Sequence, residues 1–201
     1  DVLFLTWDSP FITGLWELLH HSEIGSACVA LLPSKQLPAG KCLLEACFDL
    51  VVQSEHANEC LPFMTSYSVR ALALDISDKD LADVLGESQL QQTITHVDKK
   101  LARKIIQSKK DEMPAWYSKV EAFAAVRKTA EIEAAAGRVT EYFSAEKARL
   151  TQLAKKNPAI DLAEVHDLAA KEQALLHALN TQTHLQLSAV RLIVTTEPKS
   201  Y

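Results

Sequence analysis

Short hydrophobic runs alternate with polar turns over the first 75 residues of the chain, a pattern that is typical of strands. Four strands are predicted, at residues 2–7, 27–32, 42–53 and 68–75. Between the first two, Ser9 and Pro10 supply an N-cap and an N1 proline for a helix that runs through Leu19. Because only short connections separate the later three strands, we expect them to be antiparallel neighbours, since a parallel crossover needs about a dozen residues or more.

From Asp80 onward the chain becomes rich in Ala, Leu, Glu, Lys and Gln, which is the composition of helices. One helix is predicted for residues 88–108. A second is predicted for 114–156, beginning at a proline and ending before an Asn-Pro pair that stops it. A third helix is expected to begin with Asp161 as its N-cap and Glu164 at the capping-box position.

Apolar residues recur at steps of three and four along these last two helices, so we expect them to pack as an antiparallel hairpin over residues 114–181. The two predicted stripes are Trp116, Val120, Phe123, Ala130, Val139, Phe143, Leu150 and Leu153, and Leu162, Val165, Ala169, Leu176 and Leu179. A helix of about 40 residues is about 60 Å long. A compact chain of this length is only about 43 Å across, so part of the hairpin should protrude unless Gly137 kinks it.

The chain returns to strand character at its end, where residues 185–187 and 189–195 are again hydrophobic. A last strand at 185–196 is therefore expected to close the sheet. The predicted fold class is α+β, with a mainly antiparallel or mixed sheet and a long inserted antiparallel helical hairpin. We expect residues 1–201 to form one cooperative unit, made of a strand-rich part (1–78), a helical insertion (80–182) and the returning strand.

Composition places the chain among ordinary globular proteins, since 48% of its 201 residues are hydrophobic and 23% are charged. No uncharged apolar run reaches the roughly 18 residues that a membrane span needs, so no membrane partner is expected. The chain opens at Asp1 without an initiator Met or signal features, which indicates a part of a larger intracellular protein. The spacing of the four cysteines fits no metal site, and we expect buried, reduced thiols.

The sequence contains no GxxxxGK[ST], GxGxxG, GxSxG or HExxH motif, so no nucleotide-binding or catalytic site is predicted. The pairs His20-His21 and Asp111-Glu112 lack the geometry or context of a metal site. Cys47 has no neighbouring base that would lower its pKa, which argues against a thiolate nucleophile. We therefore assign no catalytic, cofactor-binding or metal-ligating residue to this chain.

Charge is unevenly distributed, although the formal net charge is only −5. Residues 1–76 hold nine acids and three Lys or Arg, whereas 99–128 hold nine bases and three acids. Six of these bases are candidates for contacting phosphate or an acidic partner: Lys99, Lys100, Arg103, Lys104, Lys109 and Lys110. The simpler alternative is a solvated helix face, because no aromatic residue interleaves the bases to stack on nucleotides. The sequence pI of about 5.8 also argues against a dedicated nucleic-acid-coating protein.

Several strand segments carry a more specific pattern than periodicity. They are residues 4–10 (FLTWDSP), 30–32 (ALL), 38–45 (PAGKCLLE), 61–62 (LP), 68–75 (SVRALALD) and 189–195 (AVRLIVT). In their order they resemble the C-terminal portion of the RapA (HepA) family, the bacterial RNA polymerase-associated Swi2/Snf2-type ATPases. The resemblance covers both ends of the chain, while residues 87–182 match only in helical character.

The resemblance implies a parent protein that binds core RNA polymerase and DNA or RNA, hydrolyses ATP through a helicase-like motor and promotes polymerase recycling in transcription. The motor, with its ATP and magnesium, is expected before Asp1, so this chain would be a non-catalytic accessory domain that contacts the motor. The expected location is the cytoplasm, with nucleoid association through the polymerase. Two alternatives are a coiled-coil-type assembly domain that mediates homo-oligomerisation and a small enzyme with an unrecognised site.

Overall fold

A computed structural model describes residues 26–75, 77–157 and 163–198 of the chain. The strand predicted at 2–7, the helix predicted after Ser9, the pair His20-His21 and the N-cap Asp161 lie outside these residues.

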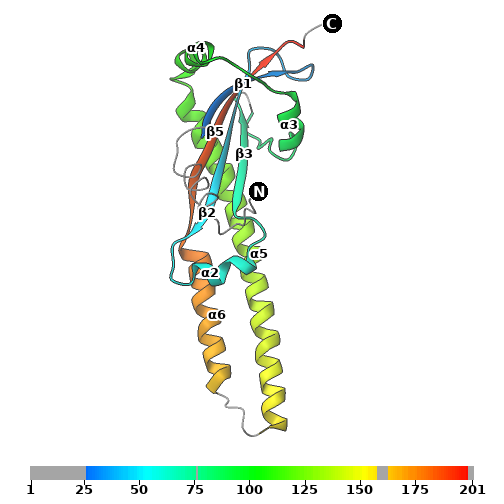
Figure 1. Ribbon diagram of the computed structural model, residues 1–201, viewed down its shortest axis with the longest axis vertical. Helices are drawn as coiled ribbons and strands as arrows, with labels where there is room; N and C mark the ends of the chain where they lie inside the picture. The colour runs from blue at the N-terminus through cyan, green and yellow to red at the C-terminus, as the bar shows by residue number, and fades with distance from the viewer. Residues whose placement is uncertain (1–25, 76, 158–162, 199–201) are drawn as a thin grey trace, which may run out of the picture.

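The described chain forms a five-stranded mixed sheet in the order β3-β2-β5-β1-β4. The two longest helices, α5 and α6, extend past one end of this sheet (Figure 1). The strands are β1 (Ala27–Pro33), β2 (Cys42–Val52), β3 (Ser68–Leu74), β4 (Thr95–His96) and β5 (Thr183–Thr196). The helices are α2 (Ala57–Cys60), η1 (Leu61–Phe63), α3 (Glu87–Thr93), α4 (Lys99–Lys109), α5 (Met113–Lys156) and α6 (Ala163–Thr181). The predicted α+β class with an inserted helical hairpin is confirmed.

The C-terminal strand β5 lies in the middle of the sheet. It pairs antiparallel with β2 along the whole of that strand and parallel with β1, where Ala27 opposes Val190. The prediction that β1 and β2 are direct neighbours is therefore wrong, whereas β2 and β3 are antiparallel neighbours as expected. The physical reason is that Leu192 and Ile193 are buried on opposite faces of the sheet, which requires a strand covered on both sides.

The single helix predicted for 88–108 is wrong, because two short helices flank a strand there. Thr93, Ile94 and Thr95 are consecutive β-branched residues, which fit a strand better than a helix, and Thr95 pairs with Leu31 of β1. The Asp98 side chain then accepts hydrogen bonds of 2.8 Å from the backbone N–H groups of Lys100 and Leu101, and so begins α4.

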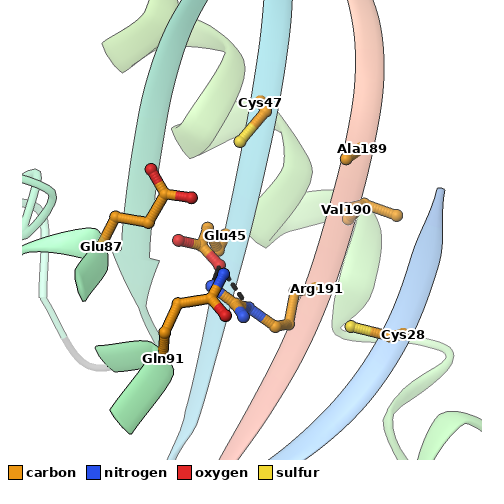
Figure 2. A pocket seen from close by; sticks show the side chains of 8 residues that line it. All are labelled: Cys28, Glu45, Cys47, Glu87, Gln91, Ala189, Val190 and Arg191. Atoms are coloured by element: carbon orange, nitrogen blue, oxygen red, sulfur yellow. Dashed lines mark hydrogen bonds and ion pairs between the residues drawn. The ribbon is translucent and has the colours of Figure 1, made fainter. Parts of the chain in front are cut away.

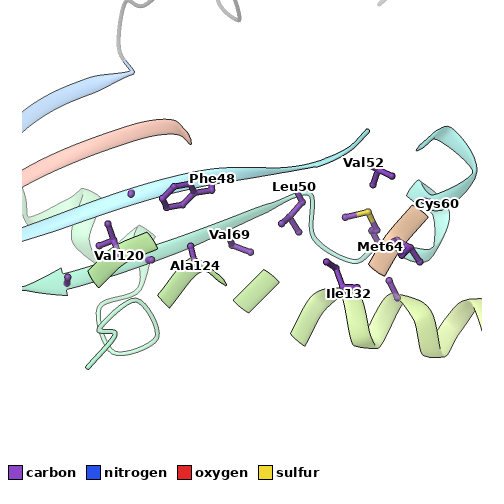
Figure 3. Close-up of a cluster of buried hydrophobic side chains, with 14 of the residues drawn as sticks. Phe48, Leu50, Val52, Cys60, Met64, Val69, Val120, Ala124 and Ile132 are labelled. Carbon is purple, nitrogen blue, oxygen red and sulfur yellow. The ribbon is translucent and has the colours of Figure 1, made fainter. Parts of the chain in front are cut away.

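Side chains of β2 alternate between two cores. Phe48 and Leu50 face α5, where they lie near Val120 and Ala124, and Val69 of β3 joins them (Figure 3). On the other face the second cluster is formed by Leu32, Leu43, Leu72, Leu74, Ala82, Leu90 and Ile193. Helix α5 therefore covers one face, and the segment through α3 covers part of the other.

Helix α5 is continuous over 44 residues, which is about 66 Å, and it runs past the end of the sheet beside α6 (Figure 1). The expected protrusion is thus observed without a break at Gly137. Two predicted stripe residues, Ala130 and Leu153, are exposed. The buried residues are Trp116, Val120, Ala124, Ile132, Ala135, Val139 and Phe143. We call the part of α5 and α6 beyond the sheet, from about residue 132 to 176, the arm.

A buried carboxylate ties the strands together. Glu45 of β2 is 4% exposed and lies between two arginines. Arg70 of β3 donates from Nε to one of its oxygens at 2.5 Å, and Arg191 of β5 donates from Nε to the other at 2.5 Å. Arg70 also donates to the carbonyls of Ala82 and Leu85 at 2.9 and 2.8 Å, so the same cluster holds the segment before α3.

The buried position of Glu45 predicts a large effect of removing its charge. Glu45→Gln leaves Arg70 and Arg191 buried without an anion, and we expect a loss of about 3–5 kcal/mol in the free energy of unfolding. Urea denaturation of the purified chain measures this loss. The control is Glu146→Gln, since Glu146 pairs with the exposed Arg149 and its substitution should leave the free energy of unfolding nearly unchanged. Equal effects of the two substitutions would contradict the assigned role.

Candidate contact surfaces

Helix α4 separates its basic and apolar residues onto different sides. At about 100° per residue, five bases fall within an arc of about 140°. They are Lys99, Lys100, Arg103, Lys104 and Lys110, and all five are exposed. Ala102 and Ile105 point the other way, into the core cluster between the sheet and α5. Five of the six candidate residues thus share one exposed side, which we call the α4 basic face, and their contact with phosphate or an acidic partner stays a prediction.

Lys109, the sixth candidate, serves the fold instead. Its Nζ pairs with Glu112 at 2.9 Å and lies 5.9 Å from the ring centroid of the buried Trp116. The hydrogen bond to Glu112 raises the pKa of Lys109. These contacts join the end of α4 to the start of α5 and fix the direction in which the α4 basic face points.

Among the described residues, the five side chains of the α4 basic face have no counter-ions. Within the part of the chain that the structure describes, no ion pair or hydrogen bond engages any of its five side chains. The Lys and Arg residues of α5 from 119 to 149, by contrast, all have partners: Lys119, Arg127, Lys128, Arg138, Lys147 and Arg149. Lys155 and Lys156, at the end of α5, are also unpaired within the described residues. The α4 basic face therefore differs from them by the number of bases that it gathers on one side of a helix, not by the lack of partners.

The helix itself gains nothing from two of these bases. Lys99 and Lys100 lie in the first turn of α4, where the helix dipole favours anions, and that turn contains no acid. Each such lysine destabilises a helix by about 0.3–1 kcal/mol at low salt. The stability of α4 therefore does not explain the positions of Lys99 and Lys100. Leu101 and Ile106, each 41% exposed, flank the basic arc.

A second exposed surface lies where the arm leaves the sheet. Phe63 of η1 packs against Tyr142 of α5 with ring centroids 5.6 Å apart, and Tyr142 packs edge-on against Phe143 at 5.2 Å. Tyr142 remains 55% exposed beside a hollow of about 540 Å³. Lys171 and Glu59 form an ion pair at the rim, so the apolar centre has a neutral border. We call Phe63, Tyr142 and Phe143 the aromatic cluster.

The two surfaces are far apart. Helix α4 lies at the end of the sheet opposite to the arm, and the long helix α5 separates it from the distal part of the arm (Figure 1). The aromatic cluster involves η1 and the middle of α5, on the arm side of the sheet. A partner on one surface therefore need not touch the other.

A hollow of about 200 Å³ lies on the sheet face opposite α5 and is lined by thiols, carboxylates and an arginine, residue types that also occur in catalytic sites. Figure 2 shows Cys28, Cys47 and Glu87 around Glu45 and Arg191. Both oxygens of Glu45 are engaged by arginines, so Glu45 is not free to act as a general base. Burial raises the pKa of Cys28 and of Cys47, and it outweighs the nearby arginines. Neither thiol is an activated nucleophile.

The cysteine prediction is correct in part. All four cysteines are free, and Cys42 and Cys60 are buried. Cys28 is exposed and Cys47 is half-buried, and both line the hollow on the sheet face opposite α5. Among the residues that the structure describes, no group of three or more His, Cys, Asp or Glu side chains is placed to hold a metal ion. Nor is any described helix long and apolar enough to cross a membrane.

Comparison with known proteins identifies one family. The family model described as "RNA polymerase recycling family C-terminal" matches residues 1–195. Among curated relatives, the RNA polymerase-associated protein RapA of Stutzerimonas stutzeri is 29% identical over 194 residues, which is 96% of this chain and 20% of that protein. RapA of Yersinia enterocolitica is 29% identical over 196 residues, or 98% of this chain and 20% of that protein. The chain thus spans about a fifth of the length of these relatives.

Raised thiol pKa values predict slow alkylation around the hollow. A thiol with a raised pKa has less thiolate at neutral pH, and its reactive fraction grows only as the pH rises through that higher pKa. We expect iodoacetamide at pH 7 to modify Cys28 several-fold more slowly than glutathione, as measured by mass spectrometry of digested protein. Since Cys28 is exposed, poor access does not explain the slowness, and the buried Cys42 serves as the inaccessible control. Reaction of Cys28 as fast as glutathione would refute the inert assignment.

Proposed function

Because the chain belongs to the RNA polymerase recycling C-terminal family, we propose that it is a non-catalytic accessory domain of an ATP-dependent, helicase-like protein that acts on RNA polymerase in transcription. The chain spans a fifth of relatives that are named RNA polymerase-associated, and its sequence lacks nucleotide-binding motifs. In this proposal the motor, with its ATP and magnesium, belongs to the remaining part of the protein.

The arm is the observation that carries this proposal. A helical pair that extends beyond its own sheet presents surface that the fold does not need for its core (Figure 1). The exposed Tyr142, supported from two sides by Phe63 and Phe143, has the character of an interface hot spot: a rigid aromatic residue beside a hollow with a satisfied polar rim. We assign this surface to a protein contact, with core RNA polymerase as the partner.

Further contacts follow from the same proposal. The motor domains of the parent protein would touch this domain intramolecularly, and DNA or RNA would reach it through the polymerase assembly. The protein would act in the bacterial cytoplasm and associate with the nucleoid through the polymerase.

Self-association through the hairpin gains no support. The apolar residues that would form a coiled-coil seam are used within the chain, since Phe143, Leu175 and Leu179 are buried in its own core. Buried Glu172 pairs with Lys147 at 2.6 Å and fixes the register of α6 on α5.

The aromatic cluster gives the sharpest test of the proposal. We expect the purified chain to bind immobilised core RNA polymerase and to hydrolyse no ATP. Tyr142→Ser should raise the Kd at least about tenfold, because truncating an exposed aromatic hot spot removes more than about 1.4 kcal/mol. Surface plasmon resonance measures the Kd.

The matched control is Val126→Ser, which changes another exposed apolar residue of α5 outside the aromatic cluster and should leave the Kd unchanged. Thermal unfolding establishes that both variants are folded. A chain that does not bind polymerase, or a Tyr142→Ser variant that binds as tightly as the unmodified chain, contradicts the proposal.

A further inference from the structure

We infer that the α4 basic face is a binding site for the phosphate backbone of duplex nucleic acid. This inference does not depend on the protein contact proposed for the aromatic cluster, because α4 lies at the opposite end of the sheet from the arm (Figure 1). Three features of α4 carry it: the segregation of its charge, the spacing of the bases and their chemical type.

Segregated charge is the first feature. The chain has a formal net charge of −5, yet five exposed bases gather on one side of the 11-residue helix α4 and its C-cap, Lys110. An acidic protein with a local basic face is oriented by the field of a polyanion as it approaches. The first-turn lysines, Lys99 and Lys100, lower the stability of α4, so the fold does not account for their position.

Spacing is the second feature. The bases form two rows along the helix axis, Lys99, Arg103 and Lys110 in one, and Lys100 and Lys104 in the other. Residues four apart lie about 6 Å apart along the axis of a helix. Each strand of a DNA duplex carries one phosphate per about 3.4 Å of its axis, so this step is close to two phosphates. Gln107 falls in the same arc and adds a neutral hydrogen-bond donor.

The third feature is residue type, which fits contact with a phosphate backbone that needs no fixed geometry. Four of the five bases are lysines, which bind phosphate as flexible point charges rather than through the planar fork of arginine. Helix α4 carries no aromatic residue, so it offers no platform on which unpaired bases could stack. The site therefore fits a duplex better than a single strand, and we expect binding that is independent of the base sequence.

A defined orientation supports the site. Asp98 fixes the start of α4, and the contacts of Lys109 with Glu112 and Trp116 fix its end. Ala102 and Ile105 hold the opposite side of the helix in the core. The α4 basic face is thus presented to solvent with its backbone already ordered, which lowers the entropy lost on binding.

The test measures binding of a 30-base-pair DNA duplex by fluorescence anisotropy, using the purified chain at several salt concentrations between 50 and 200 mM. We expect the affinity to fall with salt, with a slope of about −3 to −4.5 in a plot of log K against log salt, since up to five phosphates are neutralised. The combined variant Lys99→Gln, Arg103→Gln, Lys110→Gln should bind at least tenfold more weakly at 50 mM salt. Its slope should be smaller in magnitude by about 2–3.

The matched control is Lys155→Gln, Lys156→Gln, which neutralises two exposed bases at the other end of α5 and should bind as the unmodified chain does. Thermal unfolding checks that each variant is folded. Lys99→Gln should not lower the melting temperature, because Lys99 does not stabilise α4. No binding of the duplex, or an unchanged slope in the combined variant, overturns the inference. So does tighter binding of a single strand or of polyglutamate, which would assign α4 to unpaired nucleotides or to an acidic protein.

Discussion

The pairing of β5 between β1 and β2 is the constraint on which the rest of the structure depends. The last strand of the chain lies inside the sheet, so the long segment between β4 and β5 must leave the sheet and return to its middle. Helices α5 and α6 make that excursion, and a continuous 44-residue helix is longer than the sheet it covers. The arm is thus a direct consequence of where β5 pairs.

The Glu45 cluster reinforces the same arrangement. It joins β2 to β3 through Arg70 and to β5 through Arg191, and it fixes the segment before α3 through two carbonyl groups. A buried ion cluster of this kind is weak evidence for stability but does penalise any other register, because a slipped strand would bury an unpaired charge. The sheet therefore acts as a rigid frame between the α4 basic face and the aromatic cluster.

Local signals in the sequence were sufficient to predict β1, β2, β3, α5 and the protruding hairpin. The strand motifs also resembled the family that the comparisons identify. The neighbours of β5 were not predictable, because strand order depends on long-range pairing that no local pattern encodes. The Glu45 cluster had a signal that was missed: Glu45, Arg70 and Arg191 are charged residues within the apolar runs of three strands. Lys109 differs from its neighbours through its contacts with Glu112 and Trp116, and the helical pattern alone could not show that Trp116 lies beside it.

Native-state hydrogen exchange tests most directly whether β5 makes the sheet and the helices one cooperative unit. The account predicts that the most protected amides of β1, β2, β5 and the sheet-covering part of α5 exchange with one free energy, equal to that of global unfolding. Amides of β5 and α6 that exchange through a lower-energy opening, while β2 and β3 remain protected, would contradict it.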